Sequence, residues 1–226
     1  MNVPKPAPLA HHFHSLQQQR DTQLLGMWIF LATELLIFGA LWTGYAAYRF
    51  SYSSAFEAAS RHLSVFIGSL NTLVLLASSL TMALAVRAAR TGGRRATVVC
   101  VLLTAFLGAT FLGVKAIEYW IDYEEKLVPG LAFDPQEWSR QGIDARHVQL
   151  FLMFYYVMTG LHAVHLIIGI ALLLVVAVLA WIGYFSADHY TGVELSGLYW
   201  HFVDVVWIYL FPLLYLVGTR TSFFQH

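Results

Sequence analysis

The sequence has few charged residues and almost no cysteine. Only 12% of its 226 residues are charged and 58% are hydrophobic, whereas soluble domains carry roughly 25% charged residues. The formal net charge of +0 gives no electrostatic reason to expect nucleic-acid binding. Cys100 is the single cysteine, which excludes a disulfide or a thiolate metal cluster within one chain. This composition predicts a protein with several membrane spans.

Five apolar stretches are long enough to cross a bilayer as helices, which takes about 20 residues each. The predicted spans are 24–47, 62–86, 96–120, 148–182 and 197–218. They predict an all-α transmembrane bundle over 24–220, with a polar leader at 1–23 and a tail at 221–226. No turn residues divide the fourth stretch, so we expect one tilted or protruding helix there.

The distribution of arginine predicts the orientation of the bundle. Four arginines crowd the turn between the second and third spans: Arg87, Arg90, Arg94 and Arg95. The positive-inside rule places this turn in the cytoplasm. With five spans, the N-terminus is then cytoplasmic, whereas the acidic connection 121–147 and the C-terminus are periplasmic.

Several ionisable residues lie inside the predicted spans, where each needs a partner because lipid does not solvate charge. The residues that we expect to be related to lipid or protons are Glu34, His162, His165, His201 and Asp204. His201 and Asp204 are three residues apart, so they share a helix face and can bond each other. Lys115 and Glu118 have the same spacing, and we interpret them as a structural ion pair rather than a catalytic one. Intramembrane carboxylates mark proton relays as well as packing sites, so both interpretations stay open for Glu34.

Motifs in all five spans, in order along the chain, resemble subunit III of haem–copper oxidases. The last span contains Tyr-Trp-His-Phe-Val-Asp-Val-Val-Trp at 199–207, which resembles the signature of the family's last helix. The other stretches are Leu-Gly-Met-Trp-Ile-Phe-Leu-Ala-Thr-Glu at 25–34, Leu-Asn-Thr at 70–72 with Leu-Leu-Ala-Ser-Ser at 75–79, Lys-x-x-Glu-Tyr at 115–119, and Thr-Gly-Leu-His-Ala-Val-His at 159–165. With five spans, the chain is similar to the short bacterial form of the family.

The resemblance implies a subunit of an enzyme complex that is not catalytic on its own and binds no haem, copper or other metal itself. It implies haem and copper in partner subunits, contact with catalytic subunit I, and association with subunit II, small subunits and possibly a larger supercomplex. It also implies bound phospholipid, support of proton uptake and stability during oxygen reduction, and a place in the bacterial inner membrane. Lys115 stands where many cytochrome c oxidase members have glutamine, which favours bacterial oxidase branches and relatives associated with nitric oxide reductase. The alternative that stays open is a subunit-III-like component associated with a nitric oxide reductase or a quinol oxidase.

Two other classes compete with this interpretation. A transporter could use Glu34, His162 and Asp204 as a proton relay, but transporters usually show internal repeats and broken helices, and this sequence shows neither. A desaturase-like membrane enzyme would need histidine clusters at helix ends, whereas His162 and His165 fall in the middle of a span.

Overall fold

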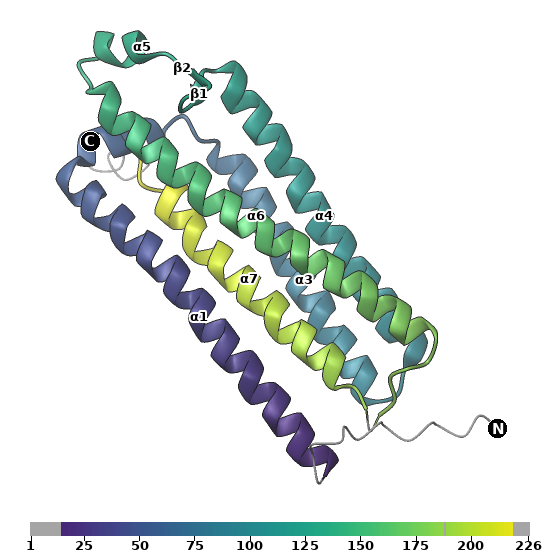
Figure 1. Cartoon of the computed structure of the whole chain (residues 1–226). Helices are drawn as coiled ribbons and strands as arrows, with labels where there is room; N and C mark the ends of the chain where they lie inside the picture. Colours follow the sequence, from purple (N-terminus) through teal and green to yellow (C-terminus); the bar gives the residue numbers. More distant parts are fainter. Residues whose placement is uncertain (1–14, 188, 219–226) are drawn as a thin grey trace, which may run out of the picture. The chain divides into compact units, whose positions relative to one another are not determined.

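The computed structural model describes residues 15–187 and 189–218. Five long helices contain most of these residues (Figure 1): α1 (Leu16–Ser51), α3 (Val65–Arg90), α4 (Arg94–Glu124), α6 (Ala145–Trp181) and α7 (Thr191–Tyr215). Each is long and apolar enough to cross a membrane. The prediction of an all-α membrane protein with five spans is therefore confirmed. Residues 1–14 of the predicted leader and the predicted tail 221–226 lie outside the described residues.

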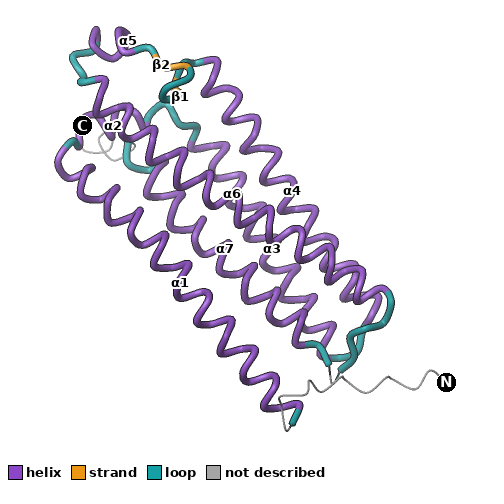
Figure 2. The backbone as a smooth tube through the Cα atoms, in the orientation of Figure 1, coloured by secondary structure: helices purple, strands orange, loops and turns teal. Residues whose placement is uncertain are grey.

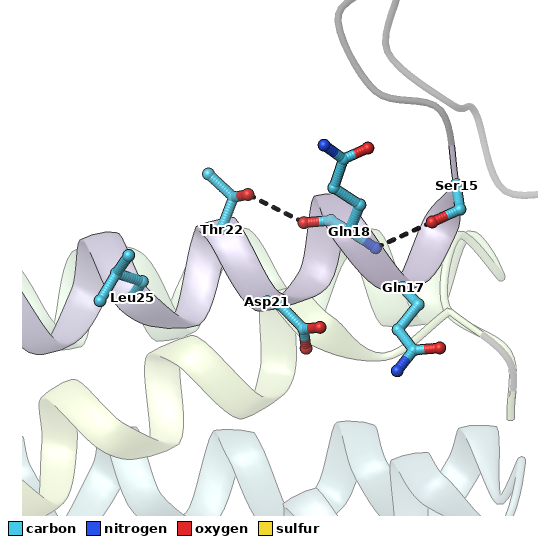
Figure 3. A pocket seen from close by; sticks show the side chains of 6 residues that line it. All are labelled: Ser15, Gln17, Gln18, Asp21, Thr22 and Leu25. Carbon is cyan, nitrogen blue, oxygen red and sulfur yellow. Dashed lines mark hydrogen bonds between the residues drawn. The ribbon is translucent and has the colours of Figure 1, made fainter.

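The helices extend beyond the apolar stretches at several ends. α1 begins at Leu16 rather than near residue 24, because a polar segment can continue a helix that the apolar run has nucleated. Ser15 caps this extension, since its Oγ accepts the Gln18 backbone N–H at 3.1 Å (Figure 3). The fourth apolar stretch forms one uninterrupted helix, α6.

Short elements fill the two longer connections of the chain (Figure 2). A helix, α2 (Ser53–Ser60), follows α1. The connection after α4 contains an antiparallel pair of two-residue strands, β1 (Leu127–Val128) and β2 (Ala132–Phe133), and then a helix, α5 (Pro135–Arg140). Asp134 caps α5 by accepting the Gln136 backbone N–H at 3.0 Å. None of these elements was predicted from the sequence, because each is too short to show a hydrophobic period.

The chain divides into two compact units, and every long helix contributes to both. Unit 1 comprises Met1–Leu35, Leu75–Ala109 and His165–Asp204, and unit 2 comprises Leu36–Val74, Thr110–Val164 and Val205–His226.

In unit 1, the core is built around Trp200 of α7. Its ring is fully buried, and its Nε1 donates a hydrogen bond to Ser78 Oγ of α3 at 3.0 Å. Gly108 of α4 and Gly169 of α6 leave room for the ring: an added Cβ would lie 2.5 Å from it at Gly108 and 3.2 Å at Gly169. Small residues on three helices therefore let the backbones approach one large ring, as membrane helices require.

In unit 2, Trp207 of α7 is a buried core residue, as Trp200 is in unit 1. Its Nε1 donates to Thr72 Oγ1 of α3 at 3.0 Å, and its ring packs edge-on against Phe111 of α4 at 4.7 Å between centroids. Tyr45 of α1 donates a hydrogen bond to the Leu213 carbonyl of α7 at 2.7 Å. Half of the most apolar stretch of α7 is buried (50%), against 11% of that of α1. By this measure, the helix that carries the signature motif is the most buried of the five long helices.

Candidate functional site

Glu34 and His165 form a buried polar pair in unit 1. Glu34 lies on α1 and His165 on α6, and Oε2 and Nε2 are 3.0 Å apart, with side chains only 15% and 11% exposed. Tyr199 of α7 donates to the His165 backbone carbonyl at 3.0 Å and stacks near Phe30 of α1. Residues that are 131 positions apart in sequence thus meet, and three helices fix their position.

This pair lines a cavity of about 620 Å³ between α1, α6 and the start of α7. Its wall is mostly apolar and includes Met27, Phe30, Ile168, Leu172, Val176, Leu179 and Leu195. Gln19, Gln23, His189, Thr191 and Ser196 add polar groups. An apolar cavity with a few convergent polar groups is the usual form of a small-molecule site, and here it suits an amphipathic ligand.

His201 and Asp204 do not bond each other, although their spacing on α7 predicts that they can. His201 Nδ1 is hydrogen-bonded to Ser79 Oγ of α3 at 2.7 Å. Among residues 15–187 and 189–218, neither carboxylate oxygen of Asp204 has a hydrogen-bond partner, although the residue is only 3% exposed and Ser79 lies near enough to interact with it. The prediction of this pair is wrong, because a hydroxyl on the neighbouring helix offers the imidazole a better-placed partner.

Lys115 and Glu118 form an ion pair in unit 2, within a larger network. The Lys115 ammonium donates to Glu118 Oε2 at 3.1 Å, to the Tyr155 hydroxyl at 3.0 Å and to the Tyr215 hydroxyl at 2.8 Å. Tyr215 in turn donates to Glu118 Oε1 at 2.6 Å. Both side chains of the ion pair are about 95% buried, with exposures of 5% and 4%.

Asp122 is a member of this network that the sequence analysis missed. It accepts hydrogen bonds from Tyr155 at 3.2 Å and from Tyr156 at 3.3 Å, and it is 4% exposed. Its position four residues after Glu118 was a usable signal, since that spacing puts both on one helix face. The acidic connection that begins there instead led us to group it with the loop.

His162, the other histidine of the motif at 159–165, packs among aromatic rings. It is 1% exposed and belongs to unit 2, where its ring packs against Phe111 at 5.6 Å and Trp207 at 5.2 Å. Within residues 15–187 and 189–218, no group of three or more His, Cys, Asp or Glu side chains is arranged to hold a metal ion.

Five spanning helices that enclose such polar networks define an integral membrane protein. The family model for cytochrome c oxidase subunit III matches residues 146–219. A cytochrome c oxidase subunit 3 of Thermostichus vulcanus is 33% identical over 201 residues, which cover 87% of this chain and 88% of that protein. The subunit 3 of Alkalihalophilus pseudofirmus is 27% identical, covering 93% of this chain and 94% of its own length. The chain belongs to the cytochrome c oxidase subunit III family.

A relative with a different arrangement is also similar. A heme-copper oxidase subunit I+III of Aeropyrum pernix is 29% identical over 204 residues, which cover 88% of this chain and 23% of that protein. The resemblance to the subunit III family that the motifs indicated is thus confirmed by similarity across most of the chain.

Proposed function

We propose that this chain is a subunit without redox centres that packs against catalytic subunit I of a terminal oxidase in the bacterial inner membrane. The observation that carries the proposal is the similarity to a relative named subunit I+III, in which the two subunits share one polypeptide. Covalent fusion is compatible with function where two subunits are neighbours. Haem and copper then belong to the partner subunits, and subunit II and small subunits complete the assembly.

The exposed surface of α1 supports this proposal. Trp28 and Leu36 are 59% and 74% exposed, and many other large apolar side chains of the helix are exposed as well. Such side chains need lipid or another apolar protein surface around them, because exposing them to water is unfavourable. A helix with so little burial within its own chain suits the edge of a larger membrane complex.

The cavity at Glu34 supports a role in lipid binding and proton uptake. Its apolar wall fits acyl chains, and the Glu34–His165 pair gives it a site that can exchange a proton. In this proposal, bound lipid fills the cavity and the pair supports proton uptake and the lifetime of the complex during oxygen reduction. The N-terminal side of the bundle faces the cytoplasm, following the arginine-rich turn.

Co-purification tests the assignment to an oxidase. Extraction of the tagged chain from its native membrane in mild detergent should bring down a haem-bearing subunit, identified by mass spectrometry and by the visible spectrum. A homogeneous, colourless preparation that still turns over a substrate would contradict the proposal.

Substitution of Glu34 tests its role. Glu34→Gln preserves the shape and the hydrogen-bonding capacity, whereas Glu34→Ala removes the carboxylate that His165 Nε2 contacts, at a cost of about 1–3 kcal/mol of stability. In both complexes the haem spectrum and the initial rate of oxygen reduction should be unchanged, and the number of turnovers before inactivation should fall. Glu137→Gln, at a carboxylate on α5 that is 57% exposed, is the control. Unaltered proton uptake and lifetime in Glu34→Gln would reduce Glu34 to a packing residue.

A further inference from the structure

In unit 1, α1 closes one side of the cavity that contains the Glu34–His165 pair. The lining residues of α1 recur at intervals of three or four positions: Gln19, Gln23, Met27, Phe30 and Glu34. This spacing places them on one face of the helix. The other side of the cavity is formed by α6, by the connection that follows it and by α7. Along this face α1 therefore borders open volume, and its position depends on contacts made elsewhere.

An ion-pair clamp, formed by Arg20, Arg90 and Glu194, joins the beginning of α1 to two other helices of unit 1. The Arg20 guanidinium of α1 donates to Glu194 Oε2 of α7 at 2.9 Å, and the Arg90 guanidinium of α3 donates to Oε1 at 2.7 Å. Both guanidinium groups also lie over the Tyr190 ring, with Cζ 5.1 and 5.6 Å from its centroid. The Glu194 side chain is only 13% exposed, so salt screens these pairs less than it screens fully exposed ones.

The clamp and the Glu34–His165 pair hold α1 at the two ends of the cavity. From Arg20 to Glu34 the helix rises by about 21 Å. Between these two points Phe30 stacks on Tyr199, with the ring centroids 6.1 Å apart. The most apolar stretch of α1 is only 11% buried, so the helix has little packing within its own chain that could replace the clamp.

We propose that the Arg20–Glu194 ion pair positions α1 over the Glu34–His165 cavity and so controls access to it. Arg20 and Glu194 are thus positioning residues for this site. Arg90 binds the same carboxylate from α3, so removing it deletes an arginine without detaching α1. The inference deepens the proposed role of the Glu34–His165 site and rests on it for its functional consequence, whereas the positioning of α1 rests on the geometry of unit 1.

Thiol labelling of the purified complex measures access to the cavity. Cys100→Ala removes the single native cysteine of the chain, and Met27→Cys then introduces a thiol at a position that lines the cavity. Leu25→Cys lies on the same helix but is 61% exposed and does not line the cavity, so it reports the general reactivity of α1. N-ethylmaleimide is added, and mass spectrometry of this chain gives the labelling rate.

Arg20→Gln should speed the labelling of Met27→Cys by about fivefold, the upper end of what a partly exposed ion pair contributes, and should leave Leu25→Cys unchanged. Arg20→Lys keeps the positive charge and should restore the rate to within about twofold of that with Arg20 intact. Arg90→Gln leaves the Arg20–Glu194 pair in place and should also stay within about twofold. Salt near 1 M, where the Debye length is about 3 Å, should speed labelling when Arg20 is present but not in Arg20→Gln.

Two results would overturn the inference. Equal acceleration by Arg20→Gln and Arg90→Gln would show that labelling follows the general stability of the bundle. Unchanged labelling of Met27→Cys in Arg20→Gln would show that the clamp does not control the cavity.

The number of turnovers before inactivation tests the functional consequence separately. It should fall in Arg20→Gln, as it should in Glu34→Gln, and recover in Arg20→Lys. Faster labelling with an unchanged lifetime would contradict the proposed role of the Glu34–His165 site while supporting the positioning of α1 by the clamp.

Discussion

Removing the Lys115 ammonium should destabilise unit 2 more than removing any exposed cation of the chain. Lys115→Met keeps the length and the apolar stem of the side chain but deletes three hydrogen bonds, to Glu118, Tyr155 and Tyr215. It leaves Glu118 and Asp122 as two buried carboxyl groups without a cation between them. The tyrosine hydroxyls can still donate to both, so neither is fully orphaned.

The magnitude follows from the burial of the pair. Breaking a buried ion pair by removing one partner costs about 3–5 kcal/mol. Because the tyrosines remain as donors, we expect a value near the lower limit, about 3 kcal/mol. For a chain of this length, each kcal/mol shifts Tm by about 2–4 °C, which predicts a fall of roughly 6–12 °C. The double variant Lys115→Met/Glu118→Gln removes one of the uncompensated charges and should recover at least about 1 kcal/mol.

Thermal unfolding of the purified complex, followed through the tryptophan fluorescence of variants and wild type under identical conditions, measures this effect. Arg140→Met is the matched control, since Arg140 and Glu137 have the same i,i+3 spacing but lie 3.6 Å apart with 73% and 57% exposure. Such a surface pair contributes at most about 1 kcal/mol. If Lys115→Met costs no more than Arg140→Met, or if the double variant recovers nothing, the ion pair and its hydrogen bonds do not stabilise unit 2.

Two further predictions concern packing and orientation. Gly108→Ala places a methyl group 2.5 Å from the Trp200 ring and should lower the free energy of unfolding by about 1–3 kcal/mol, measured by thermal unfolding. Gly113→Ala is the control, because Gly113 lies on the same helix with open space around it, and this variant should be neutral. Equal effects of the two variants would show that close packing at Gly108 does not matter. Cysteines introduced in the turn 87–95 should be protected from a membrane-impermeant thiol reagent added outside intact cells. Cysteines introduced in the loop 121–147 should be labelled by the same reagent. The reverse pattern would refute the predicted topology.

The number and type of the spans could be predicted from the sequence because they depend on local properties. A run of about 20 apolar residues must form a helix in lipid, since every backbone polar group has to be satisfied within the segment. The helix ends could not be predicted as well. Ser15 caps α1 within the polar leader, and this depends on the local hydrogen bond of one hydroxyl rather than on hydrophobicity.

Several residues of the buried polar pairs could be predicted from the sequence by itself. They are Glu34, His165, Lys115 and Glu118. For Lys115 and Glu118 the helical spacing was sufficient, because both partners lie on one helix. Spacing gave the wrong answer for His201 and Asp204 because it shows only which residues share a face and not what faces them. Ser79 binds His201, and Glu34 meets His165 from 131 residues away. Such pairings were decided only by the tertiary structure, because each polar side chain in a helix bundle takes the best-placed partner that the neighbouring helices present.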